Sequence, residues 1–558
     1  MKPSSREPFC RARLQRFLLT ALVTAAFAGS PAWANGVCES MQGMTVPAAS
    51  IALSTRGATI DHATMVESDS GLPLGQSPKT ISYCKLEGRI LPVEDVGPDN
   101  TAATGGLPIT FQVNLPEQWN RRSMQFGGGG FDGKLVTGEA NVMHATSGSL
   151  TPLQRGYATM GSDGGHVQAN MHDGSFALRP EALRNFTGDA LKKLRDTGAY
   201  LIKARYGESP EKAYFTGVST GGRETLAVIQ RWPEDFDAVI AHYPALQFLG
   251  LMLHANVVSK AMYANGGFVS AAKMNHLNAE VVDACDGLDG VSDGLINNLA
   301  ACHFDPATLR CKANIDWGSH CLTDAQISTV QAIGDNNNLA FPLANGLTYG
   351  VGYEILGGAN FGSPLGSGLL GIDPYSDSML DNGYIHIMHT EYLKYMITGD
   401  PNYDFRQFNP ETGGEWMSRV QELSAMHDAM NTDLDAFKAK GGKVLLAHGT
   451  SDTIVPLRSS IDYFERLQQR YGAEPLHDFF RFYVVAGLGH GVGRYQLTWS
   501  ALDAMEDWVE RGVSPENLVS KDALSLVGRS RPMCEYPAFP RYQGGWPNQA
   551  SSYSCSTN

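Results

Sequence analysis

Two features are scarce in this sequence: positive charge, and long apolar runs beyond the first 28 residues. The 558 residues include 43 lysines and arginines against 57 aspartates and glutamates, giving a formal net charge of -14. A basic surface for nucleic acid is therefore not expected. No later stretch reaches the roughly 18 apolar residues of a membrane-spanning helix. We expect no nucleic-acid partner and no membrane partner; the sequence does not indicate an oligomeric state.

The first 34 residues have the pattern of a bacterial secretory signal. Three arginines between residues 11 and 16 precede an apolar run over residues 17–28, and a small-x-small site ends at Ala34. Cleavage is predicted after Ala34, leaving a soluble mature chain that is periplasmic or secreted. Cys10 precedes the apolar run, which argues against a lipoprotein anchor.

Without Cys10, the chain has eight cysteines, at positions 38, 84, 285, 302, 311, 321, 534 and 555. An even number in an exported chain predicts four disulfides. Eight cysteines allow 105 connectivities, so the sequence alone does not fix the pairs. Pairing between neighbours along the chain is the arrangement that we expect.

A candidate nucleophile lies within residues 213–223, where an apolar stretch runs through Gly217-Val218-Ser219-Thr220-Gly221 into a helical pattern. A serine on a tight turn between strand and helix, with glycines two residues before and after it, is a nucleophile elbow. A single such motif is weak evidence in a chain with 61 glycines, because a glycine turn with an incidental serine gives the same pattern. The flanking strand and helix patterns favour the elbow.

Strand and helix patterns alternate from about residue 105 to residue 245, which favours a mostly parallel sheet with helices on its faces. Before this region the chain is β-rich, with short strands expected at residues 51–53, 81–84 and 88–91. The alternation stops after residue 246 and returns at residues 443–449 and 480–485. We therefore predict an α/β fold, an α/β-hydrolase sheet with a large lid-domain insertion. Residues 35–246 and 437–558 form the two parts of the catalytic domain, and residues 247–436 form the lid.

The chain offers a catalytic acid and a base in the order serine, aspartate, histidine. Asp452 follows the strand pattern at residues 443–449. His490 lies on a glycine-rich loop that follows the strand pattern at residues 480–485. In this interpretation Ser219 attacks an acyl carbon, His490 transfers its proton, and Asp452 holds the imidazole. Each residue alone has an ordinary structural alternative. The competing His166 and His448 are interpreted as structural.

The oxyanion formed during acyl transfer requires backbone donors. Thr220 follows the nucleophile and supplies one amide. The four glycines at 127–130 offer a second, for which Gly128 or Gly129 is predicted. In the lid, Tyr384, Tyr392 and Trp416 are candidates for a ring-binding slot, and Lys394 or Arg419 for a substrate carboxylate; buried packing and solvated charge are the alternatives.

A second candidate site is the acidic loop at residues 285–295, in which aspartates alternate with glycines. Oxygen ligands at such spacings suit Ca²⁺, which takes six to eight of them. The loop lacks the final glutamate of an EF-hand. A structural calcium site is predicted, with an acidic solvated turn as the alternative; its ligands are the side chains of Asp286, Asp289 and Asp293 and the carbonyls of Val291 and Leu295.

These segments together resemble the tannase and feruloyl esterase family of α/β hydrolases, which includes mono-(2-hydroxyethyl) terephthalate hydrolases. The resemblance rests on residues 83–88, 127–131, 162–166, 214–223, 233–237, 285–294 and 531–537. It implies that Ser219, Asp452 and His490 form the triad and that the aspartate loop binds calcium. Family members typically join the nucleophile and histidine loops by a disulfide. Here Val218 and Gly491 occupy those two positions, so a more mobile histidine loop is expected.

The predicted function is hydrolysis of small aromatic esters by an exported serine carboxylic-ester hydrolase. The acids implied by the resemblance are hydroxycinnamate (feruloyl), gallate and the terephthalate half-ester. One alternative is a non-catalytic calcium-binding protein that keeps the hydrolase fold. Another is a thioesterase or peptidase on the same scaffold, because all these acyl transfers use the same nucleophile and oxyanion hole.

Overall fold

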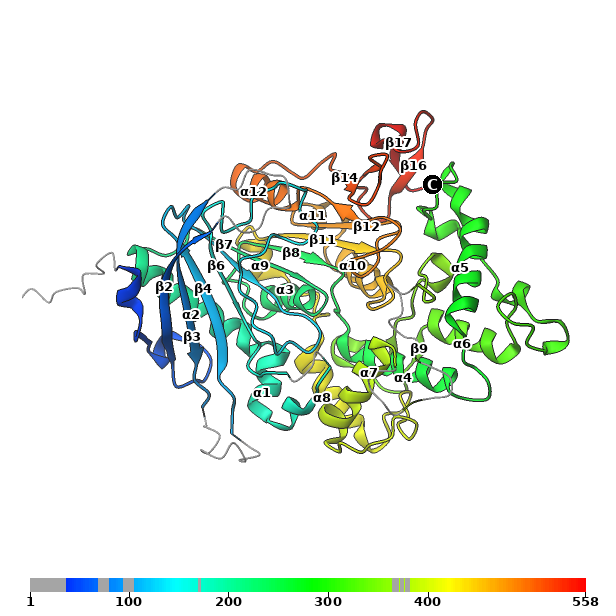
Figure 1. The fold of residues 1–558 in the computed structure, drawn as a ribbon, viewed down its shortest axis with the longest axis horizontal. Helices are drawn as coiled ribbons and strands as arrows, with labels where there is room; N and C mark the ends of the chain where they lie inside the picture. The colour runs from blue at the N-terminus through cyan, green and yellow to red at the C-terminus, as the bar shows by residue number, and fades with distance from the viewer. Residues whose placement is uncertain are drawn as a thin grey trace, which may run out of the picture.

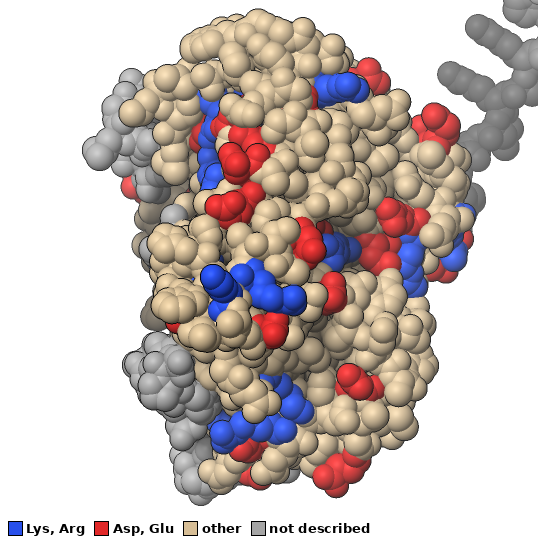
Figure 2. All heavy atoms as spheres, turned by 90° about the vertical axis from the view of Figure 1, so that its right-hand side faces the viewer, with Lys and Arg blue, Asp and Glu red and all other residues tan. Residues whose placement is uncertain are grey.

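The computed structural model describes residues 37–68, 80–93, 105–168, 172–363, 371, 376 and 382–558. The predicted secretory signal lies outside these ranges. Within them, no helix combines the length and apolar character needed to cross a membrane. On the face drawn in Figure 2, acidic and basic side chains are interspersed in a mostly uncharged surface.

A ten-stranded mixed sheet organises the molecule (Figure 1). Its amino-terminal strands pair antiparallel, whereas β5, β6, β7, β8, β11 and β12 pair parallel among themselves, so their carboxyl ends share one edge. In spatial order the strands are β1 (Thr45–Val46), β2 (Ala58–Ser68), β3 (Ile81–Ile90), β4 (Ile109–Pro116), β6 (Ala158–Ser162), β5 (Arg122–Phe126), β7 (Lys212–Val218), β8 (Ala238–His242), β11 (Lys443–Gly449) and β12 (Phe480–Val485).

Alternate residues of the central strands enter two different cores. Phe215 and Leu446 pack in the cluster that extends into the lid, whereas Tyr214 and Leu445 pack with Trp508 in a second cluster. This period of two is what a sheet covered on both faces requires. The helices outside the lid are α1 (Pro180–Arg184), α2 (Ala190–Tyr206), α3 (Thr220–Arg231), α9 (Asp435–Ala439), α10 (Leu457–Tyr471), α11 (Ala473–His477) and α12 (Ala501–Arg511).

The insertion between β8 and β11 is mainly helical and lies to the right of and below the sheet in Figure 1. Helix α4 is at its centre and packs against α6, α7 and α8. Because α4 residues such as Leu249 and Leu253 share a core with Phe215 of the sheet, the lid is anchored to the sheet by apolar packing. Its elements are α4 (Phe248–Met262), α5 (Ala271–Cys285), α6 (Asp324–Gly334), α7 (Tyr384–Glu391), α8 (Met417–His427), β9 (Asn337–Asn338) and β10 (Tyr349–Gly350).

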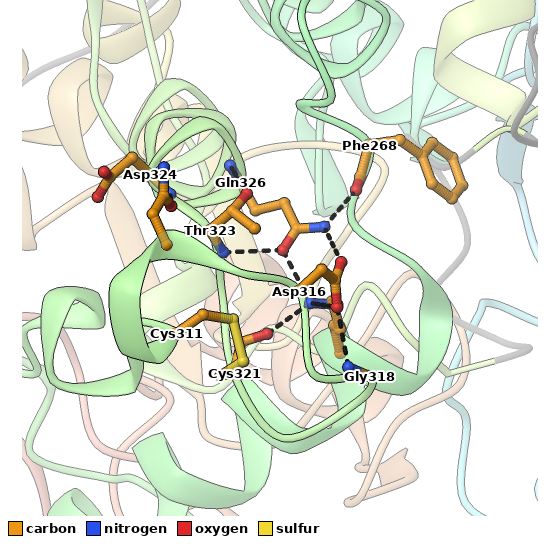
Figure 3. The surroundings of a disulfide bond; sticks show 10 residues. Phe268, Cys311, Asp316, Gly318, Cys321, Thr323, Asp324 and Gln326 are labelled. Carbon is orange, nitrogen blue, oxygen red and sulfur yellow. Dashed lines mark hydrogen bonds and ion pairs between the residues drawn. A yellow bond between two sulfur atoms is a disulfide. The ribbon is translucent and has the colours of Figure 1, made fainter.

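The eight cysteines form four disulfides between sequence neighbours, as expected: 38–84, 285–302, 311–321 and 534–555. In the lid, the Cys311–Cys321 disulfide closes the loop that carries Asp316 (Figure 3). The buried Lys273 of α5 lies next to this loop. The Lys273 ammonium donates to the Cys321 carbonyl and to Gln326, 2.5 and 2.9 Å away, and lies 3.1 Å from the Asp316 carboxylate. The disulfide loop is therefore also fixed by a charged contact to α5.

The carboxyl-terminal segment folds back over the molecule as small antiparallel sheets. Its last hairpin packs against the turn at residues 286–289, so the end of the chain covers the aspartate loop. The strands are β13 (Leu497–Thr498), β14 (Val519–Asp522), β15 (Ser530–Pro532), β16 (Phe539–Tyr542) and β17 (Tyr553–Ser556).

One local strand prediction was wrong, and two other predicted strands are parts of a single strand. Residues 51–53 form a bend instead of a strand, because the buried Ile51 anchors the segment and the amide of Ala52 donates to the Asp196 carboxylate, 2.9 Å away, in place of a neighbouring strand. The two short strands predicted at 81–84 and 88–91 are one continuous strand, β3, because it pairs along its whole length with β2.

Candidate active site

Ser219 lies between the end of β7 and the start of α3 in a strained conformation, with φ 59° and ψ -122°. Such a conformation is rarely adopted by residues other than glycine. The turn is tight: a Cβ atom on Gly217 would lie 2.2 Å from the Gly221 oxygen, and one on Gly221 would lie 2.7 Å from the Gly128 oxygen. The flanking glycines therefore let the elbow fold and let it approach the glycine loop.

Asp452 and His490 come together from the loops that follow the adjacent strands β11 and β12. The His490 Nδ1 atom lies 2.8 Å from one Asp452 carboxylate oxygen. The other oxygen accepts the amides of Ile454 and Val455 at 2.8 and 2.9 Å. Burial alone would raise the pKa of Asp452, but His490 and His448 outweigh it and hold that pKa well below its usual range. Asp452 is thus a fixed carboxylate that orients the imidazole.

Ser219 and His490 line one cavity of about 540 Å³. Among the described residues, the Ser219 hydroxyl has no hydrogen bond to the imidazole; such contacts are often long in the absence of substrate. The His490 side chain is 19% exposed, so the ring is open to the cavity. The remaining lining residues are Gly129, Gly130, Asp132, Lys134, Leu135, Val136, Tyr384 and Ile454.

The two competing histidines occupy enclosed positions. His448 is fully buried and its two ring nitrogens lie near the Ser460 hydroxyl and the Val455 carbonyl, at 2.8 and 3.1 Å. His166 stacks on Phe176, and burial lowers its pKa to about 4. Neither lines the cavity that contains Ser219.

The glycine loop differs in detail from the sequence prediction. The Gly128 amide donates to the Glu224 carboxylate and the Gly129 amide to that of Asp132, both at 2.9 Å. The two glycine amides predicted as alternatives for the second oxyanion donor thus already have acceptors. Gly130 lines the cavity, and its amide has no partner among the described residues. The Gly130 carbonyl accepts the Thr220 hydroxyl at 2.7 Å, which ties the loop to the elbow.

Asp132 and Glu224 form a buried carboxyl pair behind this loop. Burial and the neighbouring Glu224 raise the pKa of Asp132 well above its usual range, against the opposing charge of Arg223. Burial also raises the pKa of Glu224, so the two neighbouring carboxyls favour sharing a proton. This pair could not be predicted from the sequence, because neither acid belongs to a recognisable motif.

The ring of Tyr243 lies directly beside the imidazole of His490, with 4.7 Å between the two ring centroids. Its hydroxyl is 3.2 Å from His144 Nε2, and His144 Nδ1 is 3.1 Å from the Leu497 carbonyl. Because a carbonyl only accepts, His144 Nδ1 carries the proton and Nε2 accepts the Tyr243 hydroxyl. Burial lowers the pKa of His144 to about 4, which keeps this ring neutral.

The lid residues proposed for substrate contact have different positions. Tyr384 lines the cavity, whereas Tyr392 is fully buried, and its hydroxyl lies 3.2 Å from His427. Trp416 is not among the lining residues. Arg419 pairs with Glu422 at 2.8 Å, and Lys394 lies 3.6 Å from Glu391. Only Tyr384 of this set reaches the cavity.

The aspartate loop is closed by internal hydrogen bonds. Asp286 accepts the amides of Gly294 and Leu295 at 2.8 and 3.1 Å, and Asp289 accepts that of Val291 at 3.1 Å. The Asn297 side chain donates to Asp289, and the side chains of Arg531 and Tyr553 donate to Asp293. In the described part of the chain, no three acidic, histidine or cysteine side chains converge as a metal-binding group.

The parallel strands, the strained serine after β7 and the acid and base after β11 and β12 follow the plan of an α/β hydrolase. A family model described as tannase and feruloyl esterase matches residues 94–556. The chain therefore belongs to the tannase and feruloyl esterase family and is a carboxylic ester hydrolase.

Similar proteins cover from 80% to 96% of this chain. An uncharacterised esterase of Agrobacterium fabrum is 36% identical, covering 96% of this chain and 95% of its own length. Mono(2-hydroxyethyl) terephthalate hydrolase of Piscinibacter sakaiensis is 27% identical, covering 80% and 81%. The crystal structure of feruloyl esterase B from Aspergillus oryzae superimposes with a TM-score of 0.72 at 23% identity, covering 93% of this chain and 99% of that one. This last likeness concerns the fold.

Proposed function

We propose that this chain is an exported serine esterase that hydrolyses esters of small aromatic acids through Ser219, His490 and Asp452. The observation that carries the proposal is the position of His490, which is bonded to the buried Asp452 and lines the same cavity as the strained Ser219. The four disulfides and the amino-terminal signal pattern support export.

In the proposed mechanism, the Ser219 oxygen attacks the ester carbonyl while His490 Nε2 takes its proton. Asp452 holds Nδ1 and stabilises the imidazolium that forms. The amides of Thr220 and Gly130 donate to the oxyanion. His490 then gives the proton to the leaving alcohol, and a water molecule, activated in the same way, cleaves the acyl-enzyme.

The walls of the cavity favour a flat apolar acid. Leu135, Val136 and Ile454 supply aliphatic surface, and Tyr384 supplies a ring for stacking. The names of relatives, feruloyl esterase and mono(2-hydroxyethyl) terephthalate hydrolase, point to acids of this kind. Feruloyl, galloyl and terephthalate half-esters are therefore the substrates to test.

The test measures hydrolysis of methyl ferulate, methyl gallate and mono-(2-hydroxyethyl) terephthalate by the mature chain and by Ser219→Ala. Activity on at least one ester should fall by about 10⁴-fold or more in the variant, because the nucleophile is lost. The mass of the exported chain should correspond to a start at Asn35. An equal rate in the variant would refute the assignment of Ser219, and inactivity of the wild type on all three esters would refute the substrate class.

We also propose that the aspartate loop holds a structural calcium ion. Its donors are Asp286, Asp289 and Asp293 with the carbonyls of Val291 and Leu295, an all-oxygen set that suits this ion. Arg531 of the carboxyl-terminal segment pairs with Asp293. A bound calcium ion would therefore have to share the Asp293 carboxylate with this arginine. The ion would bind and rigidify the junction between α5 and the last hairpin.

Removal of calcium tests this second proposal. Because a ligand that binds the folded state stabilises it, EDTA should lower the midpoint of thermal unfolding by at least a few degrees and added Ca²⁺ should restore it. Asp289→Asn should abolish the response, and Asp305→Asn, an exposed lid aspartate outside the loop, should retain it. An unchanged midpoint in EDTA would count against the calcium site.

A further inference from the structure

A second cavity lies next to the first, with a volume of about 190 Å³. His490 lines both cavities, so the two cavities meet at this residue. The second cavity is bounded by the loops after β11 and β12 and by the lid. Its other lining residues are Gly358, Asn360, Ser363, Ser451, Thr453, Val492, Gly493 and Arg494.

The two cavities differ in their chemistry. The first has apolar walls around Ser219, and the charged residues Asp132 and Lys134 also line it. The apolar residues are Leu135, Val136, Tyr384 and Ile454. The second has an amide side chain at Asn360, hydroxyls at Ser451 and Thr453, and one guanidinium, that of Arg494. Hydroxyls and amides in a small concave site are suited to bind hydroxyl groups of a ligand.

Arg494 gives the second cavity a positive charge. Its Nη2 atom donates to the side-chain oxygen of Asn278 on α5 at 2.7 Å. Among the residues that the structure describes, Arg494 forms no ion pair with a carboxylate. Its charge is therefore available to an anionic group of a ligand, for which a guanidinium offers paired donors.

The direction of the reaction assigns the two cavities to the two halves of an ester. When Ser219 Oγ bonds to the acyl carbon, the bond from that carbon to the alcohol oxygen breaks, and the proton taken from Ser219 passes through His490 to the departing oxygen. The alcohol half must therefore lie beside His490, whereas the acid half lies beside Ser219.

We infer that the second cavity binds the alcohol half of the substrate and selects a hydroxyl-rich alcohol that carries a carboxylate. This inference rests on the proposed esterase function. The Arg494 guanidinium pairs with the carboxylate, and the polar side chains of the second cavity contact the hydroxyls. The acid half occupies the apolar cavity in every substrate, so the alcohol is recognised independently of the acid.

Three caffeate esters that share the acid and differ in the alcohol provide the test. Chlorogenate carries a cyclic polyhydroxy carboxylate, glyceryl caffeate carries a neutral polyol, and methyl caffeate has neither. We expect Arg494→Gln to lower kcat/KM for chlorogenate by about 10-fold, mainly through KM, with changes below about twofold for the other two esters. Arg494→Lys, which keeps the charge, should restore most of the chlorogenate activity. Arg541→Gln, an exposed arginine lining neither cavity, is the matched control and should change none of the three.

The outcomes separate this inference from the proposed function. If the wild type cleaves methyl caffeate and Arg494→Gln lowers all three rates equally, or none, the alcohol site is refuted while the esterase stands. If the wild type cleaves no caffeate ester and no ester of the first test, the esterase proposal itself fails. A loss confined to chlorogenate supports the inference.

Discussion

At the scale of single residues, the glycine loop is held by the buried acids Asp132 and Glu224. Each accepts one loop amide at 2.9 Å, whereas the amide of Gly130, which lines the cavity, has no partner among the described residues. A pair of carboxyls in contact can be satisfied only if they share a proton. The raised pKa of Asp132 follows from this arrangement, with burial as its main cause. The two acids position the loop, and Asp132 also lines the cavity that contains Ser219.

Replacing Asp132 tests this positioning. Asp132→Asn keeps an oxygen for the Gly129 amide and a donor for Glu224, so we expect kcat within about threefold of the wild type. Asp132→Ala removes both contacts and should lower kcat by about 10-fold or more with little change in KM, because a displaced oxyanion donor weakens binding of the transition state. Steady-state kinetics on methyl ferulate gives the result, and circular dichroism confirms that both variants fold. Equal losses in the two variants would contradict the positioning role.

At the scale of elements, Tyr243 provides a contact between β8 and the histidine loop, residues 486–493, where the family disulfide is absent. Tyr243 follows β8 directly, and its amide donates to the Ala447 carbonyl of β11 at 2.8 Å. A Cβ atom on Gly491 would lie 3.8 Å from the Tyr243 hydroxyl. The loop is also held by Gln496, whose side chain donates to the Gly491 carbonyl at 2.7 Å. A more mobile loop remains a prediction, opposed by these contacts.

Truncation of Tyr243 should loosen this loop. We expect Tyr243→Ala to lower kcat by about 10-fold and to increase hydrogen exchange of the 486–493 amides, because His490 loses the ring against which it packs. Tyr243→Phe keeps the ring and loses only the contact to His144, so its kcat should stay within about threefold. Amides in Tyr243→Ala that are as protected as those of the wild type would show that the ring does not hold the loop.

The elements that were predictable from the sequence are those with local signals. The strand-turn-helix pattern around Ser219 and the polar loops that follow apolar strands indicated the elbow, Asp452 and His490. Gly130 was not selected among four identical glycines, because only the hydrogen bonds of the neighbouring amides distinguish them. Tyr243 and Arg494 depend on contacts between segments far apart in the chain, and no sequence spacing encodes such contacts. The residues 51–53 were mistaken for a strand because a short apolar run has the same composition in a buried bend.

At the scale of the whole molecule, the buried acid Asp428 links two helices of the lid, α8 and α4, near the sheet. Asp428 directly follows α8. Its carboxyl oxygens accept the amide of Leu249, at the start of α4, and the hydroxyl of Ser424, at distances of 2.9 and 2.7 Å. Burial raises the pKa of Asp428 to about 7, although these hydrogen bonds and Arg223 oppose the shift. Because this folded-state pKa lies above the 3.8 that is usual for an aspartate, the folded protein holds a proton that the unfolded chain releases at lower pH.

This difference predicts a pH dependence of stability with a definite sign. The contribution of the protonated Asp428 to the free energy of unfolding is fully present below about pH 4. It is lost progressively as the pH rises to about 7, because Asp428 ionises at a lower pH in the unfolded chain than in the folded protein. A shift of this size corresponds to about 4 kcal/mol at most, using about 1.36 kcal/mol per pKa unit. Asp428→Asn, which is neutral at every pH, should therefore show a smaller fall in the free energy of unfolding between pH 5 and pH 8 than the wild type, measured by urea denaturation. Asp305→Asn, an exposed lid aspartate, is the control and should follow the wild type. Parallel curves for Asp428→Asn and the wild type would show that this carboxyl is already ionised in the folded protein at pH 5.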